Sequence, residues 1–315
     1  MSAHTGHRCG FQHEALFYAD EEELLAGTLP FLHAGVEAGE AMLVAMPQPS
    51  LRVLRGESNR EAEHIRFVDM QELGRNPARI ISAWHDFVDA HAAAGRCVRG
   101  IGEPIWAGRS APELDECERH EALLNLAFAD APPWSLLCPY NTGQLEDRVL
   151  RSAEHNHPLL SGVGVAQESG AYTHPSSDGP FAGELEAPSM NVAELAFERD
   201  LLPALRATLA EHARAAGLGP TRVEDLVLAT SEVAANSVLY GGGSGTLTIW
   251  RDGQCFGCDI RDSGRIAEPL VGRQRPKADQ PSGRGIWIAN QLCDLVQIRS
   301  AATGNVVRLQ MSVAF

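Results

Sequence analysis

The sequence predicts two domains of different class, an α/β domain followed by an α+β domain. The chain has 315 residues, which is long for one ordinary domain and suits two. Residues 167–190 are rich in Pro, Gly and Ser and lack apolar periodicity, which is typical of a linker. Before this stretch short apolar runs alternate with helical patterns, whereas after it two helical patterns precede most of the strand-like runs. We therefore expect domains at 8–166 and 191–315.

The segment 8–166 alternates between strand and helix patterns. The predicted strands, which are short and apolar, are 14–19, 40–46, 64–70, 97–103 and 134–140. The predicted helices are 20–39, which opens with acidic residues, 77–95, which ends at a glycine, and 112–130. Short buried strands separated by helices of this length predict a parallel sheet that helices cover on both faces.

The segment 191–315 has a different order of elements. We expect a helical region at 191–217 and a second helix at 221–242, where Thr221 and Glu224 have the spacing of a capping box. The predicted strands are 245–250, 255–262, 295–300 and 305–315, with a helix at 283–294 and an irregular stretch at 263–282. This order predicts an antiparallel or mixed sheet with helices on one face.

Composition and charge exclude several classes of protein. The chain carries 41 acidic and 26 basic residues, and its formal net charge of −15 argues against a nucleic-acid-binding surface. No apolar run approaches the ~18 residues of a transmembrane helix, and the first residues lack the apolar core of a signal peptide. We therefore expect a cytoplasmic protein that binds neither nucleic acid nor membrane. Lys277 is the only lysine, and the chain has no G-x-x-x-x-G-K-[ST] phosphate loop.

The helix predicted at 221–242 carries two polar residues in an apolar context. Glu232 and Asn236 are four residues apart and therefore lie on the same side of the helix. A carboxylate and an amide buried without partners would destabilise the fold, and a bound cation with its waters would satisfy both. The amide is a neutral oxygen ligand for Mg²⁺, and the carboxylate can orient or deprotonate a hydroxyl group beside a γ-phosphate. The alternative is a solvated face of an amphipathic helix.

Two further motifs follow this helix in the chain. Asp262 ends a strand next to Gly264, where a carboxylate can accept a hydrogen bond from an exocyclic amine and a glycine lets a flat base approach. After a stretch rich in Arg and Pro, Gly283 and Gly285 open a helix whose first N–H groups can meet phosphates. Each motif alone is weak, but E-x-x-x-N, D-x-G, a long loop and G-x-G are specific in combination.

This order of motifs resembles the GHKL superfamily of ATP-binding domains, also called the Bergerat fold, over residues 191–315. The short form, with one N-terminal helix and no long dimerisation hairpin, is similar to the anti-sigma-factor serine kinases. The resemblance implies ATP and Mg²⁺ as cofactors, Glu232 as the catalytic base, Asn236 as the Mg²⁺ ligand and an ATP lid at 265–282. It also implies a set of nucleotide-binding residues, which are Asp262, Gly264, Gly283, Arg284, Gly285 and Thr303.

The sequence departs from the family pattern at three places. Arg265 and Ile266 follow the first glycine of the D-x-G motif, where the family usually has a second glycine. Tyr240 stands where the family often has a histidine. The last strand often carries a threonine near the adenine, whereas here Thr303 comes just before the strand and Asn305 lies in it. A non-catalytic binding module with a degenerate nucleotide site is therefore an alternative to an active kinase.

In the segment 8–166 the ligand candidates are polar residues at predicted strand ends and turns, because open parallel sheets bind ligands outside the carboxyl ends of their strands. They are His13, Glu40, Glu103, Tyr140, Asn141 and His157. The runs GEAMLVAM, IGEPIW, HEALLNLAF, LLCPYN and HNHPLL resemble the MEDS domain, the methanogen/methylotroph sensory domain. That family is similar in fold to RecA-like ATPases but lacks the phosphate loop. The resemblance implies a sensor of a small molecule.

A metal site formed by His13, Cys138 and His157 is an alternative role for part of this set. No ligand spacing supports it, and a histidine on a strand is more often a satisfied structural residue. The sequence therefore favours a structural role for these side chains.

Together the two resemblances imply a signalling regulator of transcription, in which a MEDS-like sensor controls a GHKL domain. The partner would be a sigma factor, an anti-sigma antagonist or both, and the reaction would move the γ-phosphate of ATP to a serine of the antagonist. A two-component sensor histidine kinase is less favoured, because His212 is the only histidine on the preceding helix and no second hairpin helix follows it. The oligomeric state stays open, a homodimer being one of the options.

Overall fold

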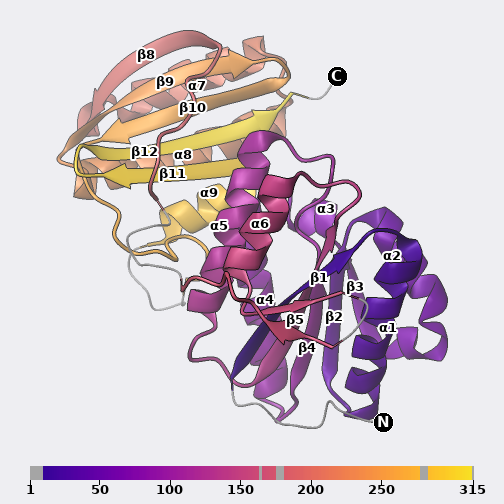
Figure 1. Ribbon diagram of the computed structural model, residues 1–315. Coiled ribbons are helices and arrows are strands. Elements are labelled where there is room, and N and C mark those ends of the chain that lie inside the picture. The colour runs from indigo at the N-terminus through magenta and orange to yellow at the C-terminus, as the bar shows by residue number, and fades with distance from the viewer. Residues whose placement is uncertain (1–9, 163–164, 175–180, 277–282, 314–315) are drawn as a thin grey trace. The chain divides into compact units, whose positions relative to one another are not determined.

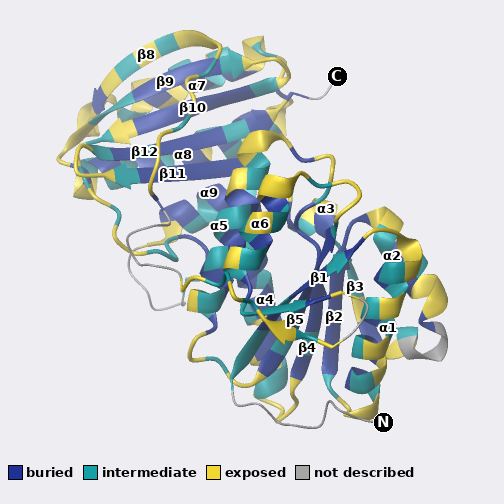
Figure 2. Ribbon diagram, in the orientation of Figure 1, coloured by how far each residue is buried: buried dark blue, intermediate teal, exposed yellow. Residues whose placement is uncertain are grey.

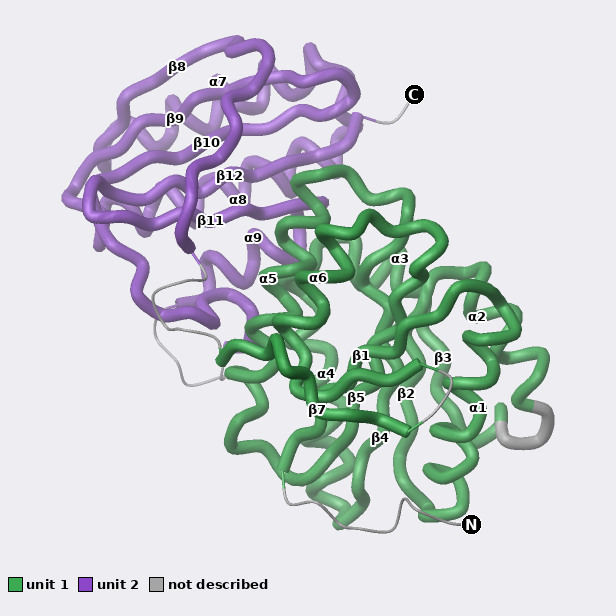
Figure 3. Tube along the Cα trace, viewed as in Figure 1, with its two compact units in different colours: residues 1–175 green, residues 176–315 purple. Residues whose placement is uncertain are grey.

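The chain folds into two compact units, Met1–Pro175 and Ser176–Phe315 (Figure 1, Figure 3). The computed structural model describes residues 10–162, 165–174, 181–276 and 283–313. The division between the units falls inside the stretch 167–190, while the domain limits 8–166 and 191–315 stay a prediction. Among the described helices, none is both long enough and apolar enough to cross a membrane.

A seven-stranded sheet forms the centre of the N-terminal unit, with the strand order β3-β2-β4-β5-β1-β6-β7. The strands are β1 (Phe11–Tyr18), β2 (Ala41–Met46), β3 (Ile65–Asp69), β4 (Val98–Gly102), β5 (Trp134–Asn141), β6 (Leu159–Ser161) and β7 (Gln167–Glu168). All neighbouring strands are parallel except β6 and β7. Strand β2 is buried at every position, as expected for a strand covered on both faces (Figure 2). The predicted parallel sheet is confirmed.

Helices cover both faces of this sheet. The helical elements are α1 (Glu21–Glu37), α2 (Gln48–Glu57), η1 (Asn59–His64), α3 (Met70–Leu73), η2 (Pro77–Arg79), α4 (Ile80–Ala92), α5 (Ala111–Ala127) and α6 (Asp147–Asn156). On one face Leu24 and Leu32 of α1 pack in the same core as Leu16 of β1. On the other face Trp84 of α4 lies directly over Gly100 of β4, where a β carbon would come within 2.6 Å of the indole ring.

The C-terminal unit contains a five-stranded antiparallel sheet in the order β11-β12-β10-β9-β8. Its strands are β8 (Met190–Glu198), β9 (Ser244–Asp252), β10 (Cys255–Asp262), β11 (Leu295–Ala301) and β12 (Gly304–Ser312). The helical elements are η3 (Arg199–Leu201), α7 (Leu202–Ala215), α8 (Pro220–Tyr240) and α9 (Arg284–Leu292). Leu209, Leu226 and Ile286, one from each α-helix, share a core with Ile249 and Leu309 of the sheet. The predicted α+β class is confirmed.

Two local predictions for this unit are wrong. The helical region expected at 191–217 begins only at residue 199, because residues 190–198 form the edge strand β8 paired with β9. Leu195 and Phe197 turn toward the core at alternate positions of this strand, so the pairing overrides the helix propensity of a segment rich in Ala, Leu and Glu. The expected capping box is also absent, because α8 begins at Pro220 with Gly219 as its N-cap, ahead of Thr221.

The second half of the stretch 167–190 packs on the C-terminal unit. Phe181 lies in the core of that unit, and its carbonyl accepts a hydrogen bond from Ser300 N. Arg308 donates to the carbonyl of Glu186 and forms a buried bidentate ion pair with Asp259 on the face of the sheet opposite the helices. The segment 181–189 is therefore part of the C-terminal unit.

Limited proteolysis tests the division into two domains. Because the Pro-, Gly- and Ser-rich stretch joins two units with separate cores, the first cuts should fall within 167–190 and leave two stable fragments. Mass spectrometry of the earliest fragments reads out the positions. First cuts inside 60–150 would contradict a two-domain organisation.

Candidate functional site

In the C-terminal unit, the middle of α8 faces the N-terminus of α9. The point of close approach is Gly285, where a β carbon would lie 2.9 Å from Asn236 Nδ2 and 3.2 Å from Glu232 Cβ. Both polar side chains of α8 are half-buried, and no hydrogen bond or ion pair joins either of them to another residue in the described part of the chain. They are therefore neither a fully solvated helix face nor a buried structural pair.

The N-terminus of α9 is open. Gly283 is the N-cap residue and adopts φ 86°, in the left-handed region that favours glycine. Among the described residues no side chain caps the helix, so its first N–H groups and the positive end of its dipole can meet an anion. Arg284 is exposed at the first turn of the helix. Glu232 and Asn236 thus lie beside the kind of helix terminus that binds phosphate groups.

Asp262, at the end of β10, is held by three donors from three different elements. Its Oδ1 accepts from Gly264 N at 2.9 Å and from Asn305 Nδ2 at 2.9 Å, and its Oδ2 accepts from Ser237 Oγ at 2.7 Å. A carboxylate can accept about four hydrogen bonds, so one acceptor position stays open on Oδ2. The half-buried carboxylate is therefore fixed in position and can still bind one further donor.

Glycines let the backbone close tightly around this carboxylate. A β carbon at Gly241 would lie 2.5 Å from Asp262 Cγ, and one at Gly264 would lie 2.9 Å from Gly241 Cα and 3.0 Å from Tyr240 O. The glycines at the end of α8 and in the D-x-G motif therefore allow the two segments to pack closely around Asp262.

The structure places most of the predicted nucleotide residues at this site but not Thr303. That residue is exposed in the turn between β11 and β12, whereas Asn305 is paired with Asp262 in the register of β12 and bonds its carboxylate. Sequence reasoning missed the roles of Ser237 and Asn305, because only the pairing of α8, β10 and β12 brings them to Asp262. Of the lid predicted at 265–282, residues 277–282, including Lys277, lie outside the described residues.

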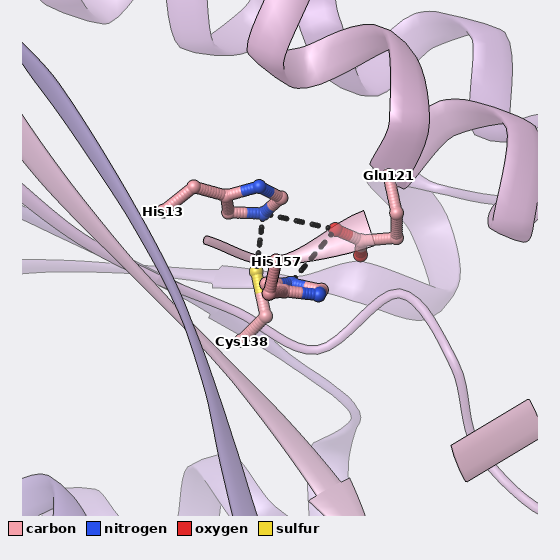
Figure 4. A group of neighbouring side chains, drawn as sticks. All are labelled: His13, Glu121, Cys138 and His157. Carbon is pink, nitrogen blue, oxygen red and sulfur yellow. Dashed lines mark hydrogen bonds and ion pairs between the residues drawn. The ribbon is translucent and has the colours of Figure 1, made fainter. Parts of the chain in front are cut away.

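In the N-terminal unit four buried side chains from separate segments meet between the sheet and α5 (Figure 4). They are His13 of β1, Glu121 of α5, Cys138 of β5 and His157, which precedes β6. His13 Nε2 lies 3.1 Å from Glu121 Oε2 and 3.4 Å from Cys138 Sγ, and His157 Nε2 lies 3.4 Å from the same carboxylate oxygen. We call these four residues the His-Cys-Glu cluster.

Burial dominates the titration of this cluster. It lowers the pKa of His13 to about 4, with a further decrease from His157, so the His13 ring is neutral at neutral pH. Burial and the neighbouring Glu121 carboxylate hold the pKa of the Cys138 thiol well above its usual value. Burial also disfavours ionisation of Glu121, but the close approach of the two histidine rings outweighs it and lowers the pKa of that carboxyl.

A second polar group lies at the carboxyl edge of the same sheet. Tyr18 ends β1, Asn141 ends the adjacent β5 in register with it, and Glu103 follows β4. Tyr18 OH donates to Glu103 Oε1 at 2.8 Å, while Glu103 Oε2 is buried without a hydrogen-bond partner among the described residues. Burial raises the pKa of Glu103 from the ordinary 4.5 to about 7. This edge is where open parallel sheets bind ligands.

The six predicted sensory residues therefore do not form one site. Glu103 and Asn141 lie at the carboxyl edge as expected. Glu40 precedes β2 at the opposite edge, where it pairs with Arg99, so it cannot join them. The other three, His13, Tyr140 and His157, lie inside the unit, and the Tyr140 ring meets the His157 ring edge-on at 5.5 Å. Sequence reasoning missed Tyr18 and Glu121, whose roles depend on strand order and helix placement.

Comparison with known proteins gives a match for each unit. Residues 12–158 match the family described as MEDS, "MEthanogen/methylotroph, DcmR Sensory domain", and residues 195–311 match the "Histidine kinase-like ATPase domain" family. Both matches confirm the resemblances drawn from the motifs. A histidine kinase-like ATPase domain implies nucleotide binding, usually with Mg²⁺. The combination with a sensory domain is that of a signalling regulator.

One similar solved structure is the crystal structure of the RsbU and RsbW domains of Rv1364c from Mycobacterium tuberculosis. It shares 18% sequence identity with this chain at a TM-score of 0.30, and the match covers 38% of this chain and 32% of that chain. No curated protein sequence matches the chain.

The raised pKa of Glu103 predicts a pH dependence of stability. Folding favours the protonated carboxyl, so its contribution is fully present below pH 4.5 and is lost as the pH rises through about 7. Between these limits the free energy of unfolding of the N-terminal unit should fall by on the order of 3 kcal/mol, since one pKa unit corresponds to about 1.36 kcal/mol. Glu103→Gln should remove this loss, as measured by urea unfolding from pH 4.5 to 8.

Glu22→Gln is the matched control, because Glu22 is an exposed carboxyl of α1. It should keep the pH dependence of the wild type. An identical pH dependence in the wild type and in Glu103→Gln would show that Glu103 does not titrate near neutrality.

Proposed function

Since the chain carries a MEDS domain followed by a histidine kinase-like ATPase domain, we propose that it is a sensor-controlled serine kinase of the anti-sigma-factor type. One observation carries the proposal. Glu232 and Asn236 of α8 lie against the N-terminus of α9, and the next residue of α8, Ser237, bonds the carboxylate of Asp262, which Gly264 and Asn305 also hold. Glu232 would supply a general base and Asn236 a metal ligand. The N-terminus of α9 would bind phosphates, and Asp262 would accept a hydrogen bond from the amine of the nucleobase.

The residues present fit a nucleotide. The open acceptor position of Asp262 Oδ2 suits the exocyclic amine of adenine, and Gly241 and Gly264 let the backbone pack closely against the Asp262 side chain that presents it. The uncapped N-terminus of α9 suits the phosphates. Asn236, which has no partner among the described residues, offers its amide oxygen to Mg²⁺.

Glu232 would act as the general base. Bound Mg-ATP supplies the phosphoryl group and the charge neutralisation that its transfer needs. The Glu232 carboxylate has no hydrogen-bond partner among the described residues and stands one helical turn before the proposed metal ligand. It is therefore free to accept the proton of an incoming serine hydroxyl and to orient that hydroxyl. Removal of this group should impair transfer while leaving binding intact.

A non-catalytic module is the second candidate, and one contact favours it. Ile266 N donates to Ser300 Oγ at 2.9 Å and to Asn305 Oδ1 at 3.1 Å, so the chain folds back on the sheet where the family usually has its second glycine. This contact holds the chain after Gly264 against Asn305, which also donates to Asp262. In such a module the nucleotide site would maintain a binding surface for a partner protein and would not catalyse phosphotransfer.

A sensor histidine kinase is less favoured by the fold. Leu205, Leu209 and Ala213 of α7 lie in the core of the C-terminal unit, so the helix that carries His212 is part of the ATPase domain. It is followed by α8 of the same domain, with no second hairpin helix among the described residues between them. A phosphoacceptor helix must instead be free to present its histidine.

The regulated partner would be a sigma factor, an anti-sigma antagonist that carries the acceptor serine, or both. The MEDS domain would bind a small molecule at the carboxyl edge of its sheet, where Tyr18, Glu103 and Asn141 meet. The direction of regulation and the identity of the ligand follow only from experiment.

The first test replaces the proposed adenine acceptor. Asp262→Asn should weaken binding of Mg-ATP about tenfold or more, because a hydrogen bond to a charged group contributes about 1.5–3 kcal/mol. Isothermal titration calorimetry measures the affinity, and the melting temperature without nucleotide reports the cost of disturbing the contacts to Ser237 and Asn305.

Asp225→Asn, earlier on α8, is the control. Unchanged affinity in Asp262→Asn would remove Asp262 from the site, and no binding by the wild type at millimolar ATP would favour a degenerate site.

The second test separates catalysis from binding. Glu232→Gln keeps shape and hydrogen bonding but loses the proton acceptor, so phosphotransfer should fall about 10²- to 10⁴-fold while Mg-ATP still binds. Asn236→Ala should weaken Mg²⁺-dependent binding as well as turnover. Radiolabelled transfer to candidate antagonists and calorimetry measure the two quantities.

Glu224→Gln, on the exposed side of the same helix, is the matched control and should behave as the wild type. If both Glu232→Gln and Asn236→Ala bind and react normally, the pair is only a helix face. If both lose stability equally with and without nucleotide, the pair is structural.

A further inference from the structure

The hydrogen bonds around the His-Cys-Glu cluster fix the protons of both histidines. Asn125 Nδ2 donates to the carbonyl of Asn156 at 2.7 Å, which turns Asn125 Oδ1 toward His13 Nδ1 at 3.2 Å. His157 Nδ1 lies 2.8 Å from the carbonyl oxygen of Ala153. Both contacts are with acceptors, so each Nδ1 carries a ring proton, and a ring in this tautomer presents the lone pair of Nε2 to the cluster.

These lone pairs point at another acceptor. His13 Nε2 and His157 Nε2 both face Glu121 Oε2, and the other carboxylate oxygen, Oε1, is buried without a hydrogen-bond partner among the described residues. The thiol of Cys138 is the one group of the cluster that has a proton to donate in this arrangement. Acceptors that face one another in a dry interior are unfavourable unless a cation lies between them.

Three distances between ligand atoms of the cluster are close to those in a tetrahedral metal site. Typical Zn–N, Zn–O and Zn–S bond lengths imply ligand-to-ligand distances of about 3.3–3.6 Å in a tetrahedron. Three of the six distances between the ligand atoms of the cluster are 3.1, 3.4 and 3.4 Å. All four ligand atoms lie within 4.8 Å of one another, and all four residues are buried. The contacts of Asn125 and Ala153 are of the kind that orient metal-binding histidines.

We propose that the His-Cys-Glu cluster binds one divalent transition-metal cation of the Zn²⁺ type through His13 Nε2, His157 Nε2, Cys138 Sγ and a carboxylate oxygen of Glu121. Two imidazoles and a thiolate select such a cation over Mg²⁺ or Ca²⁺, which take oxygen ligands. Four protein ligands in a buried position make a closed site, which is typical of a structural metal.

The site would join segments that are distant in the sequence. Its ligands come from β1, α5, β5 and the C-cap residue of α6, so a bound cation would join α5 and the end of α6 to the sheet. Strand β1 also carries Tyr18 and β5 also carries Asn141, the residues of the carboxyl edge. The metal would therefore stabilise the strands that present the proposed ligand site, although its binding does not depend on the kinase proposal.

Metal analysis of the full chain tests this directly. We expect about one Zn²⁺ per chain after purification without chelator, measured by inductively coupled plasma mass spectrometry. Removal of the metal should lower the melting temperature of the N-terminal unit, and Zn²⁺ should restore it. Titration of the metal-depleted chain with Co²⁺ should give visible bands of tetrahedral Co²⁺ and a near-ultraviolet thiolate-to-Co²⁺ band.

Variants locate the site. Cys138→Ser should abolish the thiolate-to-Co²⁺ band, whereas Cys117→Ser, at another buried cysteine that donates to Pro104 O, should keep it. Asn125→Leu, which removes the partner of His13, should weaken Co²⁺ binding about 10- to 100-fold. A folded wild type that holds no metal and gives no Co²⁺ bands would overturn the proposal, as would bands that persist in Cys138→Ser. The wild-type measurement stays decisive even if a variant fails to fold.

Discussion

The C-terminal site depends on the position of one carboxylate. Asp262 accepts hydrogen bonds from α8 through Ser237, from β12 through Asn305 and from the backbone N–H of Gly264, so a single side chain ties together the helix layer, the central strand pair and the start of the following loop. Because three acceptor positions are filled by the protein, the carboxylate cannot rotate, and its remaining lone pair has a fixed direction. The proposed phosphate end of the site depends on a separate contact, the approach of α9 to α8 at Gly285. A nucleotide that reaches both ends must therefore fit a frame that exists before it binds.

Two of the described α-helices, α5 and α8, each contain the pattern E-x-x-x-N, and the surroundings of the two pairs differ. Glu232 and Asn236 on α8 lie half-buried beside an uncapped helix terminus and have no partners among the described residues. Glu121 and Asn125 on α5 lie one turn apart as well, but both contact His13, and Glu121 is buried in the His-Cys-Glu cluster. Spacing places two polar groups on one side of a helix in both cases. What packs opposite that side decides whether they face the N-terminus of another helix or a buried group of histidine and cysteine side chains.

The sequence was sufficient for the fold class, for most strands and for the order of motifs in the C-terminal unit, because these depend on local periodicity and on glycines with a local role. It was insufficient where pairing partners decide the outcome. Residues 190–198 have helical composition and become an edge strand because β9 offers a partner, and Asn305 rather than Thr303 reaches Asp262 because of the register between β10 and β12. The buried cluster shows the same limit more strongly. Its residues are separated by up to 144 positions, so no ligand spacing could reveal it, and only the placement of β1 between β5 and β6 brings the two histidines together.

The proposed nucleotide site is preformed. In it, Asp262 would accept a hydrogen bond from the adenine amine, and the N-terminus of α9, beside α8, would bind the phosphates. A crystal structure of the full chain with Mg²⁺ and a non-hydrolysable ATP analogue tests this most directly. The account predicts the exocyclic amine of adenine within hydrogen-bond distance of Asp262 Oδ2, the phosphates at the N-terminus of α9, and Mg²⁺ bound by Asn236. A nucleotide found elsewhere on the C-terminal unit, or bound with its base away from Asp262, would contradict it.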